Sequence, residues 1–295
     1  MEFILAGLKT KANYNDTIIY YKEKNVSTIG FVGSGNMAEA MINGILKANV
    51  YRPGKVYTSD IRPERLSYLR EHYGVRTAES NAEVASKVNN LVLSVKPQNM
   101  PETLDSIKDS IKPDMLIISI AAGIKTANIS SVLGDVAIVR VMPNMPAWVD
   151  EGASVLFANE KAQAKVEVAR LVLLSVGEAI VVEDEDLLDA VTAVSGTGPA
   201  YFFLLMQEMI KAGIELGLPE DIAKELVIQT AKGAAILAER AAENGETPDV
   251  LTKKVATPNG TTEAAFKVFA ERNFEEVVLA AVRRAAERSR ELSIG

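Results

Sequence analysis

A short apolar stretch, a glycine-rich turn and an amphipathic stretch follow one another directly, and this order constrains the fold more than any other feature of the sequence. Residues 28–32 are apolar enough for a buried strand, and Gly33-Ser34-Gly35-Asn36-Met37-Ala38 follows them. Met37, Met41 and Ile45 then recur at helical spacing. Glycine permits a tight turn and lets backbone N–H groups approach a pyrophosphate at the positive end of a helix. This order predicts a dinucleotide-binding domain rather than a plain glycine turn.

A second strand is expected over residues 55–58, and an acidic residue follows it. Asp60 lies at about the spacing at which a ribose-binding carboxylate follows such a glycine turn. A carboxylate there would bind the ribose hydroxyls of NAD and repel the 2′-phosphate of NADP, whereas Ser59 and Arg62 could hold that phosphate. Alternatively, Asp60 only caps the helix that Pro63 opens. The choice between NADPH and NADH therefore stays open at this point.

Three further strands are expected over residues 91–95, 115–120 and 137–141, each nearly continuous in apolar residues as buried parallel strands are. Ser80 and Glu83 form the pattern of a capping box before the intervening helix. The alternation predicts an α/β fold whose N-terminal part is a Rossmann-type doubly wound sheet. Ligands bind at the carboxyl ends of the strands of such sheets, which singles out the loops at 95–98, 121–123 and 142–146. Ordinary turn chemistry is the alternative reading of these loops.

Composition limits the remaining possibilities. A chain of 295 residues with 48% hydrophobic residues can bury one large core or two ordinary ones, and we expect two domains. A net charge of -7 argues against a nucleic-acid binder, and no apolar run approaches the roughly 18 residues of a membrane span. The absence of cysteine excludes disulfides and thiolate metal sites. Because the N-terminus has no signal-peptide pattern, we expect a cytoplasmic protein. We further expect small-molecule partners and no bound metal.

The chain contains one histidine, His72, in a polar segment that resembles the end of a helix. Acid/base catalysis by histidine is therefore not expected. A reductase built from this sequence must manage without it or act on a substrate that is already protonated.

The second half of the sequence is helical. A last strand over residues 178–182 precedes the acidic run 183–186, which we interpret as a solvated hinge without chemistry. Apolar helices are expected over residues 199–217 and 219–243. A small domain cannot cover so much apolar surface alone, which favours a homodimer over an internal core helix. The predicted domains are an N-terminal extension at 1–26, a dinucleotide-binding domain at 27–183, and a helical dimerisation and substrate-binding domain at 184–295.

Two hydroxyl-rich segments of this half are candidate sites. Ser195-Gly196-Thr197-Gly198-Pro199 is expected to be a flexible turn that faces an anion or caps a helix. Thr257-Pro258-Asn259-Gly260-Thr261-Thr262 precedes a helix expected over residues 263–272. Its N–H groups could bind a substrate carboxylate through the helix dipole, with Thr262 free to bond the reacting nitrogen. Ordinary capping is the alternative.

Five motifs together resemble the pyrroline-5-carboxylate reductase family. They are GFVGSGNMA at 30–38, VKPQ at 95–98, RVMPN at 140–144, SGTGPAY at 195–201 and PNGTT at 258–262, in the family's order from about residue 28 to the C-terminus. The resemblance implies hydride transfer from NADPH or NADH to the imine of 1-pyrroline-5-carboxylate, which gives L-proline. It also implies a homodimer or a ring of dimers.

The resemblance carries the site residues over as follows. Cofactor contacts fall on Val32, Gly33, Ser34, Gly35, Asn36, Met37, Ser59, Asn81, Val95, Lys96, Pro97, Ala121 and Ala122, to which the spacing argument adds Asp60. Substrate contacts fall on Asn259, Gly260, Thr261 and Thr262, with Thr262 as the catalytic residue.

The sequence departs from the family pattern at three places. Met145 stands where a threonine is usual, and Phe266 replaces a smaller aliphatic residue. Asp60-Ile61 occupies the place where many NADPH-using members have Asn-Arg, which weakens any expectation of NADPH.

The implied mechanism does not need histidine. The substrate can carry a proton on its imine nitrogen, so orientation supplies much of the catalysis. Two other readings stay open: another imine or 2-hydroxy-acid reductase, which would usually use a Lys or His acid, and a nicotinamide-sensing protein without catalysis. Activity on six-membered imines also stays open, because one methylene changes binding by only about 1–3 kcal/mol.

Overall fold

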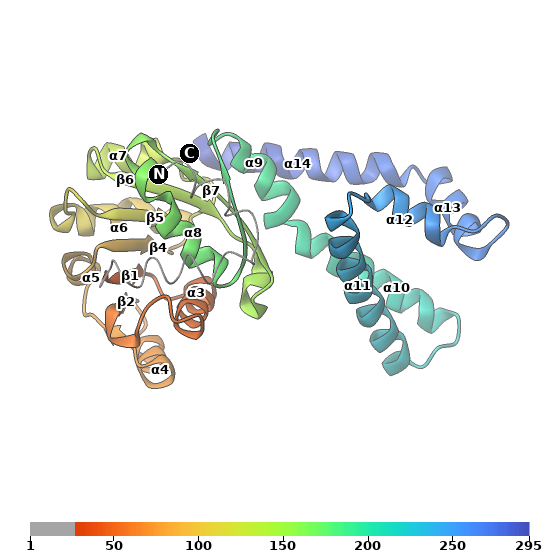
Figure 1. The fold of residues 1–295 in the computed structure, drawn as a ribbon, viewed down its shortest axis with the longest axis horizontal. Helices are drawn as coiled ribbons and strands as arrows, with labels where there is room; N and C mark the ends of the chain where they lie inside the picture. Colours follow the sequence, from red (N-terminus) through yellow and green to blue (C-terminus); the bar gives the residue numbers. More distant parts are fainter. Residues whose placement is uncertain (1–26, 295) are drawn as a thin grey trace. The chain divides into compact units, whose positions relative to one another are not determined.

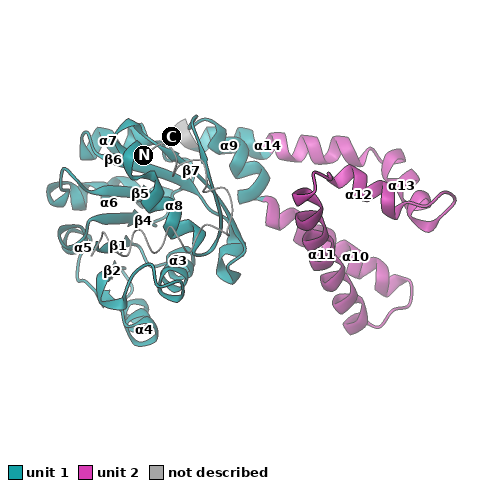
Figure 2. Cartoon of the chain, in the orientation of Figure 1, with its two compact units in different colours: residues 1–197, 285–295 teal, residues 198–284 magenta. Residues whose placement is uncertain are grey.

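The structure is a computed structural model that describes residues 27–294, with side chains up to residue 292. The chain forms two compact units (Figure 2). Unit 1 combines the described residues up to Thr197 with those from Ala285 onward, and unit 2 runs from Gly198 to Arg284. The extension predicted at 1–26 lies outside the described residues. The division into units falls after the boundary at 183/184 that the sequence suggested for the domains.

Unit 1 is built on one eight-stranded sheet of order β3-β2-β1-β4-β5-β6-β7-β8 (Figure 1). All neighbouring strands are parallel except β6 and β7, which are antiparallel. The strands are β1 (Ile29–Val32), β2 (Val56–Ser59), β3 (Arg76–Thr77), β4 (Asn90–Leu93), β5 (Leu116–Ser119), β6 (Ala137–Met142), β7 (Gly152–Ala158) and β8 (Gly177–Val182). The six strands predicted from the sequence are confirmed, whereas β3 and β7 were not predicted.

Helices cover both faces of this sheet, as a doubly wound fold requires (Figure 1). One hydrophobic cluster joins Phe31 and Val92 to helices α3 (Asn36–Lys47), α4 (Pro63–Tyr73) and α8 (Val166–Leu174). A second cluster joins Leu91 and Leu93 to helices α5 (Asn81–Lys87), α6 (Met100–Ile107) and α7 (Thr126–Leu133). Successive residues of β4 thus enter opposite clusters, as the alternation of strand side chains dictates. The predicted fold class is confirmed.

Helix α3 is held close to the segment that follows α8. It buries Met41 and Ile45, and Gly44 faces the chain at Ser175. A Cβ at Gly44 would lie 2.7 Å from the carbonyl oxygen of Ser175, so only glycine allows this approach. Burial of each large side chain contributes about 1.5–3 kcal/mol, and this packing positions the N-terminus of α3 next to the glycine turn.

The predicted capping box at α5 is present in a modified form. The Ser80 hydroxyl accepts a hydrogen bond from the N–H of Glu83, as predicted. The Glu83 carboxylate, however, accepts from the N–H of Glu79 at 2.9 Å, one residue before the cap. Both bonds fix where α5 begins.

The acidic run at 183–186 is not simply solvated, so that expectation was wrong for one residue. Glu185 accepts hydrogen bonds from the backbone N–H and the hydroxyl of Thr126, at 2.8 and 2.9 Å, and thereby satisfies the first turn of α7. It also forms an ion pair of 3.2 Å with Arg140, whose side chain is only 4% exposed. Asp186, by contrast, forms an exposed pair with Lys125.

The segment around Ser195 is helical, which corrects the expectation of a flexible turn. A π-helical stretch, Thr192–Gly196, directly follows α9 (Leu187–Val191). The hydroxyls of Ser195 and Thr197 donate to the carbonyls of Val191 and Thr192. Both hydroxyl groups are therefore used within the helix and do not face an open loop.

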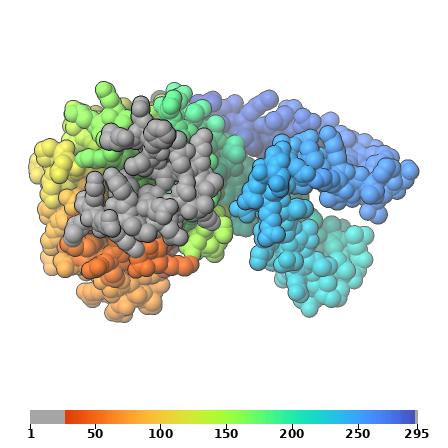
Figure 3. All heavy atoms as spheres, in the orientation of Figure 1, coloured from red at the N-terminus to blue at the C-terminus, as the bar shows by residue number. Residues whose placement is uncertain are grey.

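Unit 2 contains the three helices that the sequence predicted, which are α10 (Gly198–Glu215), α11 (Glu220–Glu243) and α13 (Thr261–Glu271). It also contains α12 (Pro248–Val255) and the first part of α14 (Phe274–Ile294), which were not predicted. The α10–α11 region, drawn in cyan in Figure 3, leaves many large apolar side chains exposed. On α10 these are Phe202, Phe203, Leu204, Leu205, Met209 and Ile214. None of the helices in the described part of the chain combines the length and the hydropathy of a membrane span.

Candidate functional site

The glycine turn lies where the strand order of the sheet reverses. β1 lies between β2 and β4. The sheet continues from β2 to β3 on one side and from β4 to β5 on the other, so the strand order reverses at β1. Ligands of doubly wound sheets bind outside the carboxyl ends of the strands at such a switch point. Gly33 comes directly after β1 and has a φ of 85°, a left-handed conformation that favours glycine.

Gly33 is also required by its neighbours. A Cβ there would lie 2.9 Å from the carbonyl oxygen of Ser94, at the end of β4. Ser94 in turn donates from Oγ to the Gly33 carbonyl at 2.6 Å and to the Val32 carbonyl at 3.1 Å. Ser94 therefore ties the ends of the two central strands together. Sequence reasoning missed this residue, because it lies one position before the VKPQ motif.

The N-terminus of α3 fits a phosphate group. Gly35 is its N-cap, no side chain of the described residues caps it, and a Cβ at Gly35 would meet no atom within 4 Å. The first N–H groups of a helix have no partner within the helix, and they carry its positive partial charge. Gly35, Asn36 and Met37 thus present backbone donors at an open surface, as the binding of a dinucleotide pyrophosphate requires.

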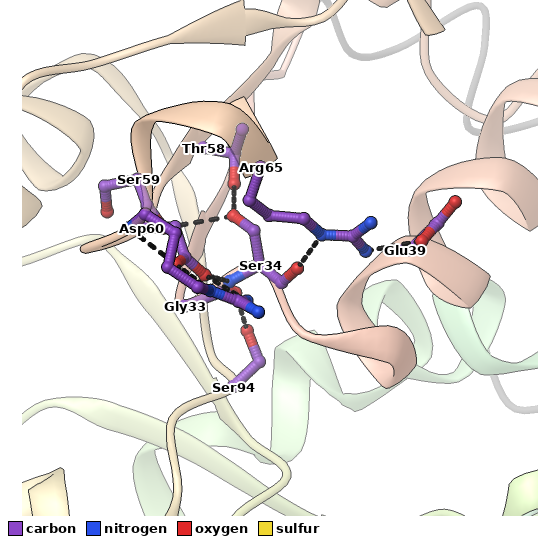
Figure 4. Close-up of polar contacts among 9 residues, drawn as sticks. Gly33, Ser34, Glu39, Thr58, Ser59, Asp60, Arg65 and Ser94 are labelled. Atoms are coloured by element: carbon purple, nitrogen blue, oxygen red, sulfur yellow. Dashed lines mark hydrogen bonds and ion pairs between the residues drawn. The ribbon is translucent and has the colours of Figure 1, made fainter. Parts of the chain in front are cut away.

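Ser34 has its polar atoms bonded within the protein. Its N–H donates to Asp60 Oδ2 at 2.8 Å, and its carbonyl accepts from Arg65 Nε at 2.6 Å. Its buried hydroxyl lies against the hydroxyl of Thr58 and donates to the Ser59 carbonyl at 3.1 Å. Ser34 therefore joins the turn to the end of β2 (Figure 4).

Asp60 is held in place by backbone as well as by side-chain donors. Besides Ser34, the N–H of Arg62 donates to Oδ1 at 3.0 Å, and the Arg62 guanidinium forms hydrogen bonds of 2.9 and 3.2 Å to the two oxygens. Burial alone would raise the pKa of Asp60, but these hydrogen bonds outweigh it and lower the pKa below its ordinary value. Asp60 is therefore a fixed carboxylate beside the glycine turn.

A second ion pair lies on the other side of Ser34 in Figure 4. Arg65, which bonds the Ser34 carbonyl, also pairs with Glu39 of α3. Glu39 accepts a further hydrogen bond of 2.9 Å from the Tyr73 hydroxyl. Burial opposes ionisation of Glu39, but the bonds from Arg65 and Tyr73 lower its pKa overall. The pair connects α3 to α4 next to the turn.

Other predicted cofactor residues lie at the neighbouring strand ends. Ser59 Oγ donates to Asn81 Oδ1 at 2.8 Å, so these two predicted contacts touch each other at the end of β2. Val95, Lys96 and Pro97 follow β4, and a Cβ at Gly33 would also lie 2.9 Å from Val95 Cγ1. The structure therefore brings these residues together with the glycine turn.

Ala121 and Ala122 follow β5, and Ala121 is buried in the second hydrophobic cluster. The adjacent Gly123 has a φ of 76° and packs against the backbone of Leu292, near the end of α14. The C-terminal helix thus supports the loop that carries the two predicted contacts.

The predicted substrate residues lie in unit 2, at the start of α13. Helix α13 begins at Thr261, two residues earlier than expected, with Gly260 as its N-cap. Asn259 has a φ of 61°, and its N–H donates to Glu263 Oε2 at 2.7 Å. A Cβ at Gly260 would lie 2.5 Å from Thr257 Oγ1, so this tight turn requires glycine.

Thr261 and Thr262 occupy the first turn of α13 rather than the loop before it. Their N–H groups have no partner within the helix, and within the described chain no side chain caps this helix. Glu263 places a carboxylate in the same turn, and its pKa is lowered by the N–H of Asn259 and by Lys267. That acid orders the turn through Asn259, a role that the sequence did not suggest.

The metal-ligating residue types do not gather anywhere in the described chain, which contains no group of three His, Asp or Glu side chains able to hold a metal ion.

Comparison with known proteins finds a matching family for a segment in each half of the chain. Residues 185–292 match the family described as pyrroline-5-carboxylate reductase dimerisation, and residues 28–123 match the family described as NADP oxidoreductase, coenzyme F420-dependent. The pyrroline-5-carboxylate reductase of Pseudomonas aeruginosa is 44% identical over 267 residues, which cover 90% of this chain and 96% of that protein.

Solved structures give the same result. A pyrroline-5-carboxylate reductase of Coxiella burnetii superposes with a TM-score of 0.83 at 37% identity, covering 91% of this chain and 99% of that one. The pyrroline carboxylate reductase of Plasmodium falciparum, solved with NADP bound, superposes with a TM-score of 0.81 at 27% identity, covering 91% of this chain and 98% of that one.

Proposed function

The chain belongs to the pyrroline-5-carboxylate reductase family, and we propose that it performs the family's reaction with the residues described above. It is an NAD(P)H-dependent oxidoreductase that reduces the C=N bond of 1-pyrroline-5-carboxylate to give L-proline. The observation that carries this assignment is the 44% identity over 90% of the chain, which covers the glycine turn and the start of α13 alike.

The residues of unit 1 would hold the nucleotide. The open N-terminus of α3 provides backbone donors for the pyrophosphate, and Asp60 lies where ribose hydroxyls are bound in this type of fold. When bound, the reduced nicotinamide supplies the hydride.

The residues at the start of α13 would hold the imino acid. The free N–H groups of Thr261 and Thr262 and the helix dipole suit a carboxylate. The hydroxyl of Thr262 would form a hydrogen bond with the imine nitrogen and so orient the ring. As the hydride adds to the imine carbon, the C=N π electrons become the lone pair of a nitrogen that already carries its proton. No protein acid is required, so the scarcity of histidine is no obstacle.

The alternative reductase would use a lysine as general acid, and the surface lysines of the helical half do not support it. Of the six lysines of that half, five form an ion pair with a nearby carboxylate, such as that of Glu208 or Glu246: Lys211, Lys224, Lys253, Lys254 and Lys267. These exposed pairs are ordinary helix-surface contacts. The sixth, Lys232, lies exposed on α11.

The direct test measures loss of reduced-nicotinamide absorbance with 1-pyrroline-5-carboxylate, followed by assay of proline. We expect turnover, and we expect Thr262→Ala to lower kcat roughly 10- to 100-fold with unchanged cofactor affinity. Thr262→Ser should retain most of the activity. The matched control is Thr252→Ala, because the Thr252 hydroxyl only bonds the Pro248 carbonyl within α12. Equal activity of Thr262→Ala and the wild type would remove the catalytic role of Thr262.

The dimerisation match over residues 185–292 assigns self-association to the helical part, so the protein is a homodimer or a larger homo-oligomer. We further propose a ring of dimers and a cytoplasmic location. The first follows the family resemblance, and the second is supported by the lack of cysteine in a protein that uses a soluble metabolite. Light scattering and cell fractionation test them.

A further inference from the structure

We propose that this protein selects NADH over NADPH and that Asp60 sets the preference. The inference rests on the proposed function and deepens it, because it names which of the two cofactors the ribose end of the site accepts.

The position of Asp60 does not depend on a mobile partner. Two backbone N–H groups, those of Ser34 and Arg62, donate to its two oxygens at 2.8 and 3.0 Å. Its side chain is only 7% exposed. The negative charge is therefore fixed beside the glycine turn, and a bound nucleotide cannot displace it without breaking backbone hydrogen bonds.

NADPH differs from NADH by a phosphate on the 2′-oxygen of the adenosine ribose, which carries between one and two negative charges near neutral pH. Two neutral ribose hydroxyls can donate to a carboxylate, whereas a phosphate can only accept. A fixed carboxylate beside a 2′-phosphate leaves two like charges facing each other with no proton between them.

The two arginines beside Asp60 and Ser34 do not offset this repulsion, because both are paired. The Arg62 guanidinium bonds both oxygens of Asp60, and Arg65 bonds Glu39 and the Ser34 carbonyl. If Arg62 turned to a 2′-phosphate, it would leave Asp60 without its cationic partner next to that phosphate. The ribose of NADH, by contrast, requires only that a half-exposed guanidinium give up part of an ion pair, which costs little.

The residue between them adds no positive charge. Ile61 is 94% exposed and offers an apolar surface with no hydrogen-bond donor on its side chain. The loop after β2 therefore presents, in order, a fixed carboxylate, an apolar side chain and an arginine already bound to that carboxylate.

The decisive measurement compares two fragments that lack the nicotinamide: ADP-ribose and the same molecule with a 2′-phosphate. Calorimetric titration of the full-length wild-type protein at fixed ionic strength should give at least about tenfold tighter binding of ADP-ribose, in line with the loss of a charged hydrogen bond. The ratio of kcat/KM for NADH and NADPH should favour NADH. Equal affinity, or tighter binding of the phosphorylated fragment, overturns the proposal.

The variant Asp60→Asn removes the charge and keeps an oxygen that can accept from Ser34. It should shift the affinity ratio toward the phosphorylated fragment roughly 10- to 100-fold. The matched control is Glu64→Gln, which removes an exposed charge from the first turn of α4 and should change the ratio less than about threefold. If Glu64→Gln shifts the ratio as much as Asp60→Asn, the preference reflects general charge and the role of Asp60 is lost.

Arg62→Gln provides a test that does not depend on the folding of the Asp60 variant. It should leave the wild-type preference in place, because Asp60 keeps its two backbone donors. A selective loss of affinity for the phosphorylated fragment would show that Arg62 holds the phosphate and would overturn the proposal. Fragment binding uses no imine, so a protein that binds ADP-ribose selectively but does not reduce the imine would refute the proposed function and leave this inference standing.

Discussion

Ser94 Oγ donates a hydrogen bond of 2.6 Å to the carbonyl of Gly33, so the ends of β4 and β1 are joined at the point where the strand order reverses. The backbones of the two residues also approach closely, because the Ser94 carbonyl oxygen would lie 2.9 Å from a Cβ at Gly33. The separation of the two loops that follow these strands is therefore fixed by a serine and a glycine. The positions of the loops after β1 and β4 both depend on this contact, whether or not the Ser94 side chain touches the cofactor.

Gly33→Ala should therefore damage both folding and cofactor binding. The new Cβ meets backbone, which cannot rotate away, and the φ of 85° is unfavourable for alanine. We expect the free energy of unfolding to fall by about 1–3 kcal/mol and the cofactor affinity to fall at least roughly tenfold. Urea denaturation and fluorescence titration with the reduced cofactor measure the two effects.

Gly35→Ala is the matched comparison within the same turn. Its φ of -66° suits alanine, and a Cβ there meets no protein atom within 4 Å. Stability should change by only a few tenths of a kcal/mol, while cofactor affinity should still fall if a pyrophosphate approaches the backbone here. Unchanged affinity in Gly35→Ala would show that the cofactor does not lie against the N-terminus of α3.

Glu185 and Asp186 are adjacent acids with different environments, and this difference predicts different costs of substitution. Glu185→Ala would leave the buried Arg140 without its carboxylate and the N–H of Thr126 without an acceptor. Breaking one side of a buried pair costs about 3–5 kcal/mol. Asp186→Ala removes only an exposed pair with Lys125 and should barely change the urea midpoint. Similar urea midpoints for the two variants would show that the bonds of Glu185 to Thr126 and Arg140 do not stabilise the fold.

The pH dependence of stability should follow Asp60 and Glu39, whose pKa values are lowered in the folded protein. In the unfolded chain these groups titrate near their ordinary values, about 3.9 and 4.3. Their contribution is fully present above those values and is lost as the pH falls through the lower folded pKa values. The free energy of unfolding should therefore fall as the pH is lowered through about 4, toward the lower pKa values of the folded protein. Glu39→Gln should flatten part of this slope in urea titrations, and an unchanged slope would rule out Glu39 as a contributor.

The sheet was predictable from the sequence where its strands are continuous apolar runs. β7 (Gly152–Ala158) was missed, because Gly, Ala and Ser weaken its apolar signal and it pairs antiparallel in a sheet read as parallel. β3 is only two residues long, Arg76 and Thr77, and has no hydrophobic pattern. Both strands exist because a neighbouring strand provides hydrogen-bond partners, which local sequence does not report.

The candidate site, like the sheet, was predictable from the sequence only in part. The sequence indicated the glycine turn and the start of α13, because glycine and hydroxyl residues mark turns and helix caps locally. The contacts of Ser34 with Thr58 and of Ser94 with Gly33 join strands that are far apart in the chain, so no spacing rule predicts them. The helical state of residues 192–196 was also missed, since the hydroxyl and glycine residues there are typical of turns. The hydroxyls of Ser195 and Thr197 instead bond carbonyls of the same helical segment.

The exposed apolar side chains of α10 should mediate self-association of the chain. Phe202 and Phe203 are 65% and 50% exposed, and so many exposed large apolar side chains on one helix indicate an interface. Because the dimerisation match covers this helix, we expect the protein to elute as a dimer or a larger species at micromolar concentration in size-exclusion chromatography with light scattering. Phe202→Asp would place a charge without a partner in that interface, which costs several kcal/mol, and should shift the protein toward monomer.

The control for this prediction is Lys211→Ala on the same helix, since Lys211 forms only an exposed pair with Glu208 and should leave the mass unchanged. Circular dichroism of both variants separates loss of association from loss of helix. A dimeric Phe202→Asp protein would exclude this residue from the interface and direct attention to the exposed apolar residues of α11, such as Leu226 and Leu237. A monomeric wild-type protein would mean that the apolar surface of α10 is not an interface between copies of the chain. Monomer together with imine reduction would further show that catalysis needs one chain only.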